Sequence, residues 1–169
     1  MDRVANIRRG ICDDLATVID FAQHLNSIHH LERPDIFVDA VANAPGTRDH
    51  WLSFLESDTD VVLIAELDAS PVGFVSAHIS TTTNPLMHAM QICRIGSICV
   101  LEPYRGRGIG KELLGAARDW AIDKGAEELK LAVWTFNSAA IKMYEEFGME
   151  VRTLEMGMRL APAPVSTAT

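Results

Sequence analysis

The chain has 169 residues, of which 48% are apolar and 22% are charged, and its formal net charge is −8. This length and composition predict one ordinary globular domain with a single core. The negative charge argues against a nucleic-acid-binding protein, whose affinity would rest on a basic surface. No stretch has the apolar core of a signal peptide or the length of a membrane span, so the sequence predicts a cytoplasmic protein without a membrane partner.

The cysteines argue against two further classes of protein. Cys12, Cys93 and Cys99 form no C-x-x-C pair and cannot all pair with one another. A disulfide framework or a structural zinc site is therefore not expected. The sequence predicts reduced cysteines that serve as packing residues, and it predicts no metal.

Hydrophobic periodicity in the first half of the chain predicts one strand followed by helices. The residues "VANIRRG" alternate apolar and polar side chains, which is typical of a short strand. Asp13 and Asp14 can then open a helix that runs toward His24, and Pro34 predicts a break near Arg33. The expected ranges are 4–10 for the strand and 13–24, 37–43 and 49–56 for the helices.

The second half predicts strands interleaved with two helices. "DVVLIAEL" and "VGFVSAHI" are rich in β-branched residues and joined by a short turn, which indicates a hairpin. Gly125 and Gly148 mark the ends of the two helices. The expected strands are 60–67, 72–79, 91–100, 129–133, 150–154 and 156–160, and the expected helices are 110–124 and 138–147. These elements predict a single mixed α/β domain over residues 1–160, followed by a disordered tail at 161–169.

The stretch "YRGRGIGK", residues 104–111, lies between a predicted strand and a predicted helix. Unpaired N–H groups at a helix N-terminus carry positive partial charge, so such a turn is suited to bind phosphate. A dinucleotide-binding fingerprint would need glycine at Lys111 or at Leu113. A Walker A loop would need glycine in place of Arg105 and Ser or Thr in place of Glu112. The spacing therefore excludes both nucleotide loops.

Two motifs together carry a family resemblance. The first is R-x-x-G-x-G at residues 105–110, and the second is N-x-x-A-x-x-x-Y-x-x-x-G at 137–148, one helix and one strand later. Asn137 and Tyr144 are seven residues apart, so they fall on one face of a helix. This pair of motifs resembles the GNAT family of N-acetyltransferases, and the order of predicted elements follows that family. The resemblance implies a central, mostly antiparallel sheet that is splayed between two parallel strands and flanked by helices.

The resemblance also implies that acetyl-CoA binds as the co-substrate. Its diphosphate would lie on the backbone N–H groups of residues 105–111, where three basic side chains add positive charge. Its pantetheine arm would pair with the main chain of the preceding strand, with a further hydrogen bond from Asn137. The implied cofactor-binding residues are Ile98, Cys99, Val100, Arg105, Gly106, Arg107, Gly108, Ile109, Gly110, Lys111, Asn137 and Ala140.

The implied chemistry is direct attack of an amine on the acetyl carbonyl in a ternary complex, with coenzyme A leaving as a thiolate. Tyr144 is the implied general acid, because a hydroxyl that donates to the thiolate improves the leaving group. The base stays open, since many relatives carry a carboxylate near the positions of Gly96 and Ser97 and this chain has none there. Glu66 and His78, on the two preceding strands, are candidate bases, and a water chain to solvent would need neither.

His29 and His30, in the predicted helical hairpin, are candidate acceptor-binding residues, and a histidine titrates near neutrality and could serve as a base. We expect a small-molecule primary amine as the acceptor, and no nucleic acid. A protein N-terminus or lysine is the alternative substrate, and a non-catalytic acyl-CoA-binding sensor is the alternative of another class. The sequence leaves a homodimer open and does not identify the amine.

Overall fold

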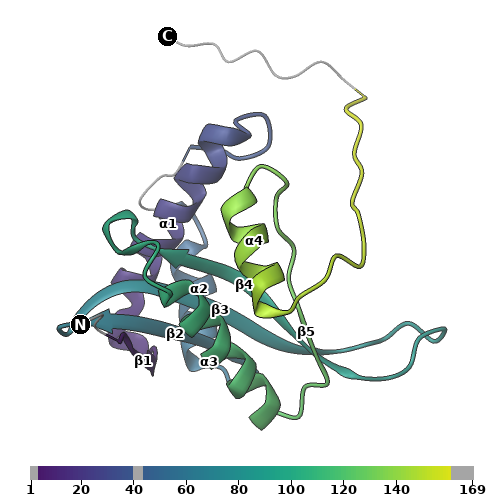
Figure 1. The fold of residues 1–169 in the computed structure, drawn as a ribbon, viewed down its shortest axis with the longest axis horizontal. Helices are drawn as coiled ribbons and strands as arrows, with labels where there is room; N and C mark the ends of the chain where they lie inside the picture. The colour runs from purple at the N-terminus through teal and green to yellow at the C-terminus, as the bar shows by residue number, and fades with distance from the viewer. Residues whose placement is uncertain (1–3, 40–43, 161–169) are drawn as a thin grey trace.

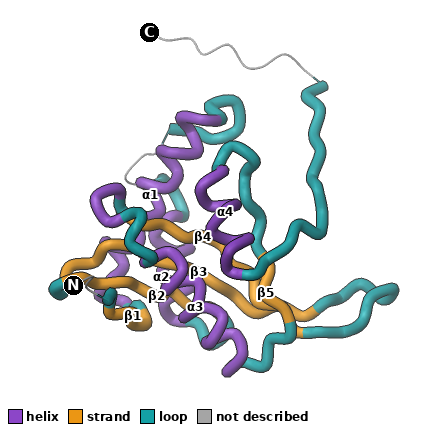
Figure 2. The backbone as a smooth tube through the Cα atoms, viewed as in Figure 1, coloured by secondary structure: helices purple, strands orange, loops and turns teal. Residues whose placement is uncertain are grey.

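The computed structural model describes residues 4–39 and 44–160 (Figure 1). Within those ranges it contains five strands and four α-helices, which Figure 2 distinguishes by colour. The strands are β1 (Asn6–Arg9), β2 (Asp60–Leu67), β3 (Ser70–Thr81), β4 (Gln91–Val100) and β5 (Glu128–Lys130). The helices are α1 (Leu15–Glu32), α2 (Thr47–Glu56), α3 (Ile109–Asp123) and α4 (Ser138–Phe147), with 3₁₀ turns η1 (Cys12–Asp14) and η2 (Glu102–Tyr104).

The strands form one sheet in the order β1-β2-β3-β4-β5. Strands β1 to β4 pair antiparallel with their neighbours, whereas β5 pairs parallel with β4. A parallel pair needs a crossover connection, and α3 provides it between β4 and β5. The mixed sheet flanked by helices confirms the predicted fold class.

Alternating side chains along β2 separate two hydrophobic cores. Val61 and Leu63 belong to a first cluster that α3 and α4 cover, whereas Val62 and Ile64 belong to a second cluster that α1 and α2 cover. Successive side chains of a strand point to opposite faces, so a continuous apolar run supplies both cores at once. The sheet is thus the middle of three layers (Figure 1). None of the described helices is both long and apolar enough to cross a membrane.

Strands β4 and β5 diverge, and this divergence positions the candidate site. Their pairing covers only Ile92–Arg94 opposite Glu128–Lys130. The register of β4 against β3 then shifts by one residue, which leaves Gly96 as a bulge before Ser97. From the bulge to Val100, β4 keeps β3 on one side and has no strand partner on the other within the described residues. The splay expected from the family resemblance is therefore present.

The first half differs from the sequence prediction in its helices. Helix α1 continues to Glu32, well past His24, because no breaker precedes Pro34, and Arg33 caps it with non-helical backbone. The predicted helix 37–43 does not form at residues 37–39, and residues 40–43 lie outside the described part of the chain.

The closing strands predicted at 150–154 and 156–160 are wrong for this structure. Residues 149–160 have no regular structure, and Figure 1 shows them leaving the base of α4 and rising at the side of the domain. A strand needs a backbone partner, and no described backbone–backbone hydrogen bond joins this stretch to β5 or to another strand. The predicted tail, 161–169, lies outside the described residues.

Candidate functional site

The glycine-rich turn between β4 and α3 leaves its backbone bare. Gly106 and Gly108 have φ angles of +74° and +84°, and a Cβ built at either position would meet nothing within 4 Å. Gly108 is the N-cap of α3, and the first backbone hydrogen bond of the helix joins Glu112 N–H to Gly108 O at 3.1 Å. The preceding N–H groups of the first turn carry the positive end of the helix dipole. This geometry is suited to hold an anion such as a diphosphate.

Two arginines of the turn contact backbone carbonyls nearby. Arg105 donates from Nε to Val100 O at 2.8 Å, and its Nη2 lies 3.4 Å from His24 Nε2 on α1. Arg107 lies over the ring of Tyr104, with its Cζ 5.6 Å from the ring centroid. Both guanidinium groups remain exposed at the rim of the turn. They add positive charge beside the bare backbone of the turn.

The glycine-rich turn and the second motif are in contact through helices α3 and α4. The Lys111 ammonium pairs with the Glu146 carboxylate across the two helices, which lowers the Glu146 pKa. A Cβ added at Gly110 would lie 2.8 Å from Met143 Sδ. The absence of a side chain at Gly110 therefore lets α4 approach α3, whereas Gly106 and Gly108 face open space.

Asn137 and Tyr144 hold different positions on α4. Asn137 is the N-cap, and its Oδ1 accepts a hydrogen bond from Ala140 N at 3.2 Å. Tyr144 is 8% exposed and belongs to the first hydrophobic cluster. Burial raises its pKa to about 12, because desolvation disfavours the phenolate. The Tyr144 hydroxyl is thus protonated at neutral pH and can donate a proton.

At the end of β4, main-chain groups are unpaired within the described residues on the side where β4 and β5 diverge. Ile98, Cys99 and Val100 pair with β3 on one side only, so their other backbone edge faces the divergence from β5. The Cys99 side chain packs in the second cluster, and burial raises the pKa of its thiol to about 11. Cys99 is therefore a packing residue at its side chain, and only its main chain is available to a ligand.

A cavity of about 310 Å³ lies between α1, α2 and the bulge of β4. It reaches the main chain of β4 at Gly96 and Ser97, one residue before Ile98. Its wall combines apolar, aromatic and a few uncharged polar side chains. The lining residues are Ala22, Leu25, Asn26, His29, Phe37, Trp51, Gly96, Ser97 and Trp134.

Four rings at one end of this cavity form an aromatic cluster, which comprises His29, Phe37, Trp134 and Phe136. The centroid of His29 lies 4.9 Å from that of Phe37 and 5.9 Å from that of Phe136. Trp134 lies 5.4 Å from Phe37 and stacks on Phe136 at 6.0 Å. The burial of His29 among these rings lowers its pKa below the usual value, because desolvation disfavours the imidazolium.

The other three candidate residues lie outside the cavity lining. His30 donates from Nδ1 to Phe37 O at 2.7 Å, and so anchors the loop after α1. Glu66 binds Arg8 Nε at 2.8 Å at the β1 edge of the sheet. His78 stands opposite Arg94 on β4, before the bulge. The structure therefore brings His29, and none of these three, to the cavity.

The sequence prediction missed most of the cavity wall. Phe37, Trp51 and Trp134 line it, but none follows a motif with a known spacing. The sequence contained one usable signal, the pair of aromatic residues at 134 and 136 between a predicted strand and the Asn137 cap. Aromatic residues in a loop just before a helix that carries a binding motif are candidates to line a ligand pocket.

Sequence comparisons relate this chain to a family of known proteins. Residues 21–149 match the acetyltransferase (GNAT) family. An uncharacterized N-acetyltransferase of Methanocaldococcus jannaschii is 31% identical over 107 residues, which cover 63% of this chain and 46% of that protein. An N-alpha-acetyltransferase of Sulfolobus acidocaldarius is 36% identical over 97 residues, which cover 54% of this chain and 58% of the relative. The chain thus spans about half the length of these curated relatives.

Solved structures show the same fold. A mutant of the BH1408 protein from Bacillus halodurans has a TM-score of 0.85 at 23% identity, covering 92% of this chain and 99% of that one. The aminoglycoside N-acetyltransferase AAC(6')-Iy in complex with CoA has a TM-score of 0.75 at 21% identity, covering 94% of this chain and 97% of that one. The family match includes both the glycine-rich turn and α4. The chain therefore belongs to the acetyltransferase (GNAT) family.

Proposed function

We propose that this protein transfers an acetyl group from acetyl-CoA to the primary amine of a small molecule. The observation that carries the proposal is the path of β4. This strand borders the aromatic cavity at Gly96 and Ser97 and then presents the open main chain of Ile98 to Val100. It leads into the bare glycine-rich turn at the start of α3. One strand therefore connects an acceptor cavity to an anion site. Acetyl-CoA requires such a connection, because its thioester must reach the acceptor while its diphosphate is held at the anion site.

The donor half would be held mainly by main-chain groups. The diphosphate would lie on the N–H groups of Gly106 to Lys111, with Arg105 and Arg107 at the rim. The pantetheine arm would pair with the free edge of β4 at Ile98 to Val100. Asn137, whose Oδ1 is used by the cap, would contribute its side-chain NH₂ group. The acetyl carbonyl would then lie near the bulge, where backbone N–H groups could stabilise the developing oxyanion.

The acceptor would be an amine with an apolar or aromatic body. Among the residues that the structure describes, none that lines the cavity is an aspartate or a glutamate. A polycation such as an aminoglycoside needs carboxylates to replace its hydration, whereas a single amine on an apolar body fits aromatic walls. A cavity of about 310 Å³ also suits a small molecule better than a peptide chain.

Two side chains would move protons in this reaction. Tyr144 would donate to the leaving thiolate, since its hydroxyl is protonated at neutral pH. His29 would accept the proton of the incoming amine, directly or through water. Its lowered pKa keeps the imidazole neutral near pH 7, and only the neutral form accepts a proton. Glu66 is a weaker candidate for the base, because it is engaged with Arg8.

A second candidate function is acetylation of a protein N-terminus. The relative from Sulfolobus acidocaldarius is named an N-alpha-acetyltransferase and is 36% identical over the matched residues. In that case the peptide would enter beside the loop after α1, and the aromatic cavity would receive the first side chain.

The test measures the release of coenzyme A thiol with a panel of acceptors at fixed acetyl-CoA. The panel contains an arylalkylamine, a linear alkylamine of similar length, spermidine, an aminoglycoside and short peptides. We expect the arylalkylamine to give the highest kcat/KM. Turnover confined to peptides would favour the second candidate. Binding of acetyl-CoA without turnover of any acceptor would favour a non-catalytic module.

A matched pair of variants tests the role of the cavity. Trp134→Leu removes a ring from the cavity wall, whereas Trp120→Leu changes a tryptophan of α3 outside it. We expect Trp134→Leu to raise KM for the amine about tenfold, which corresponds to the loss of one well-packed ring. Trp120→Leu should leave KM for the amine unchanged. Equal effects of the two substitutions would contradict the acceptor assignment.

A further inference from the structure

Arg33 caps helix α1 at the rim of the aromatic cavity. Its backbone N–H donates to His29 O at 2.8 Å, and its carbonyl accepts hydrogen bonds from Ile36 N and Phe37 N at 3.0 Å. Its guanidinium lies over the ring of Trp134, with Cζ 5.6 Å from the ring centroid. Phe37 and Trp134 both line the cavity, so Arg33 contacts the cavity wall through two residues.

Two side chains of α1 fix the loop that follows Arg33. Asn26 Nδ2 donates to Val38 O at 3.1 Å, and His30 Nδ1 donates to Phe37 O at 2.7 Å. The loop is therefore bound back to α1 by side-chain hydrogen bonds as well as by its own turn. A rim that is ordered before a ligand arrives loses less conformational entropy when the ligand binds.

The Arg33 guanidinium uses one of its edges and leaves another available. Its Nε and Nη2 donate to the two carboxylate oxygens of Asp35, at 2.8 and 2.9 Å. Nη1 carries two further N–H groups, and no hydrogen bond within the described residues uses them. The side chain is also partly exposed. A planar guanidinium can therefore bind a second carboxylate through the edge formed by Nη1 and Nη2, with two parallel N–H···O bonds.

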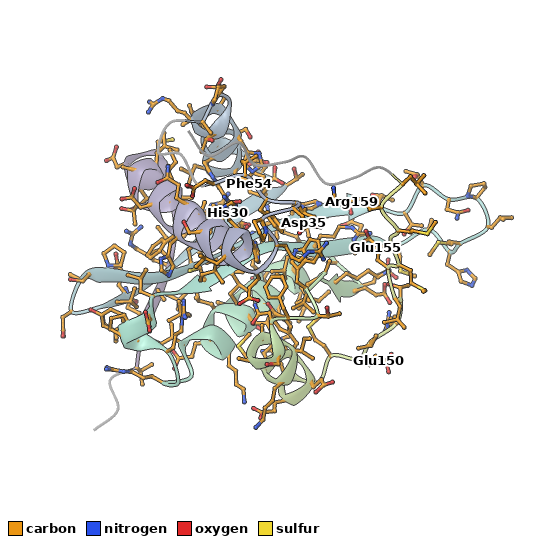
Figure 3. All side chains as sticks on the ribbon, turned by 90° about the horizontal axis from the view of Figure 1, so that it is seen from above. His30, Asp35, Phe54, Glu150, Glu155 and Arg159 are labelled. Carbon is orange, nitrogen blue, oxygen red and sulfur yellow. The ribbon has the colours of Figure 1, made fainter. Side chains whose placement is uncertain are left out.

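Asp35 does not neutralise this rim of the cavity. Arg159 Nη2 also lies 2.8 Å from Asp35 Oδ2, and Figure 3 shows Arg159 and Asp35 pointing toward each other. One carboxylate thus pairs with two guanidinium groups, and the formal charges of the three side chains sum to +1. The described cavity wall adds no carboxylate to this balance. The rim therefore favours an anionic group on the ligand and disfavours a polyamine.

His29 and Arg33 are four residues apart, so they lie on the same side of α1. One helical turn, about 5.4 Å along the axis, separates them. His29 is the proposed acceptor of the amine proton, and Arg33 offers a site for an anion. A molecule whose amine and carboxylate are attached to the same carbon can meet both side chains. Its remaining substituent would then lie against the aromatic rings of Phe37 and Trp134.

We propose that the acceptor is an α-amino acid with a large apolar side chain, and that Arg33 binds its carboxylate. This inference rests on the acetyltransferase function proposed above and narrows its substrate class. The amine nitrogen forms a bond to the acetyl carbon, the thioester C–S bond breaks, and the product is an N-acetyl amino acid. The amine proton goes to His29 or to water, and the thiolate of coenzyme A receives the proton of Tyr144. A phosphate in place of the carboxylate fits less well, because its charge of about −1.5 to −2 exceeds the charge of the rim.

Three acceptors with one scaffold test the substrate class on the native chain: phenylalanine, phenylalaninamide and phenethylamine, each assayed by release of coenzyme A thiol. We expect the KM of phenylalanine to be about tenfold below the other two, which leave the free edge of Arg33 unpaired. The amide has a less basic amine and so more free base at pH 7, which biases the comparison against this result. Turnover of phenethylamine with a KM no higher than that of phenylalanine would overturn this inference and leave the proposed function standing. Thiol release with no acceptor would overturn both.

A matched pair of arginine variants tests the carboxylate site. Arg33→Gln should raise KM for phenylalanine about tenfold, change kcat less than about twofold and leave KM for phenethylamine unchanged. The unchanged KM for phenethylamine also shows that the variant is folded. Arg118→Gln is the control, because Arg118 likewise lies over an aromatic ring, that of Phe147, and pairs with a neighbouring carboxylate, that of Asp119, but on α3. It should change neither KM. An equal rise in KM for both acceptors in Arg33→Gln would overturn the assignment of the carboxylate to Arg33.

Discussion

Gly110 of α3 and Met143 of α4 meet so closely that a single added carbon would fill the space between them. A Cβ at Gly110 would lie 2.8 Å from Met143 Sδ. The glycine-rich turn and the second motif are therefore parts of one packed unit. Substituting Gly110 by alanine should stabilise an exposed helix by up to about 1 kcal/mol. Here the displaced Met143 side chain should cancel that gain.

Unfolding in urea checks this coupling. Gly110→Ala should stabilise the Met143→Ala variant by about 1 kcal/mol and should not stabilise the native chain. The difference between the two effects is the coupling free energy of the contact. The same change in both backgrounds would mean that the helices do not depend on this contact.

Replacing Tyr144 by phenylalanine tests the general acid. The Tyr144 hydroxyl has a pKa of about 12 and stays protonated over the whole working range of an enzyme. We expect Tyr144→Phe to lower kcat about 100-fold, in the range typical of a lost acid catalyst, with KM for acetyl-CoA changed less than about twofold. Tyr104→Phe, at the chain's other tyrosine, should leave kcat unchanged. An unaltered kcat in Tyr144→Phe would refute the assignment.

The pH profile tests His29 as the base. Burial lowers the folded pKa of His29, so the imidazole loses its proton at a pH below the ordinary value of 6.5. Activity should therefore be fully present at pH 7 and fall only as the pH drops through this lowered pKa. His29→Gln should lower kcat/KM for the amine and abolish the acidic limb. An acidic limb that survives in His29→Gln would assign the base to water or to another group.

The Asp14 carboxylate should contribute pH-dependent stability. Arg8 donates to both carboxylate oxygens, at 2.7 and 2.8 Å, and these bonds lower the folded pKa of Asp14. Because its folded pKa is depressed, Asp14 stabilises the fold at pH values above its unfolded pKa, near 3.8. This stability is lost as the pH falls through the folded pKa. Asp14→Asn should thus cost about 1 to 3 kcal/mol at pH 7 and progressively less below about pH 4.

Thermal unfolding of Asp14→Asn at several pH values checks that its destabilisation decreases as the pH falls, with Asp13→Asn as the control. Asp13 is the exposed neighbour of Asp14 in the turn η1. Its substitution should change the melting temperature little at any pH. A destabilisation of Asp14→Asn that persists unchanged at pH 2 would show that the carboxylate charge is not the source.

Local pattern was sufficient for most of the elements. The apolar runs of β2 and β3, the amphipathic spacing of α3 and the cap at Asn137 each depend on neighbours in sequence, so they were predictable. The order of the predicted elements indicated a mixed α/β domain, and the two motifs at residues 105–110 and 137–148 carried the resemblance to the family. The expected range of the first helix stopped at His24, which was too short, but the break that Pro34 predicted near Arg33 is where α1 ends.

The partners of the elements were decided only by the tertiary structure. Residues 153–160 have the alternation of a strand, yet a strand forms only where its backbone pairs with another, and the structure pairs these residues with no strand among the described residues. The same limit applied to the site. His29, His30, Glu66 and His78 are alike as sequence candidates, but only the fold placed His29 in the cavity and Glu66 against Arg8. Sequence determined which residues can do the chemistry, and long-range packing decided which of them meet.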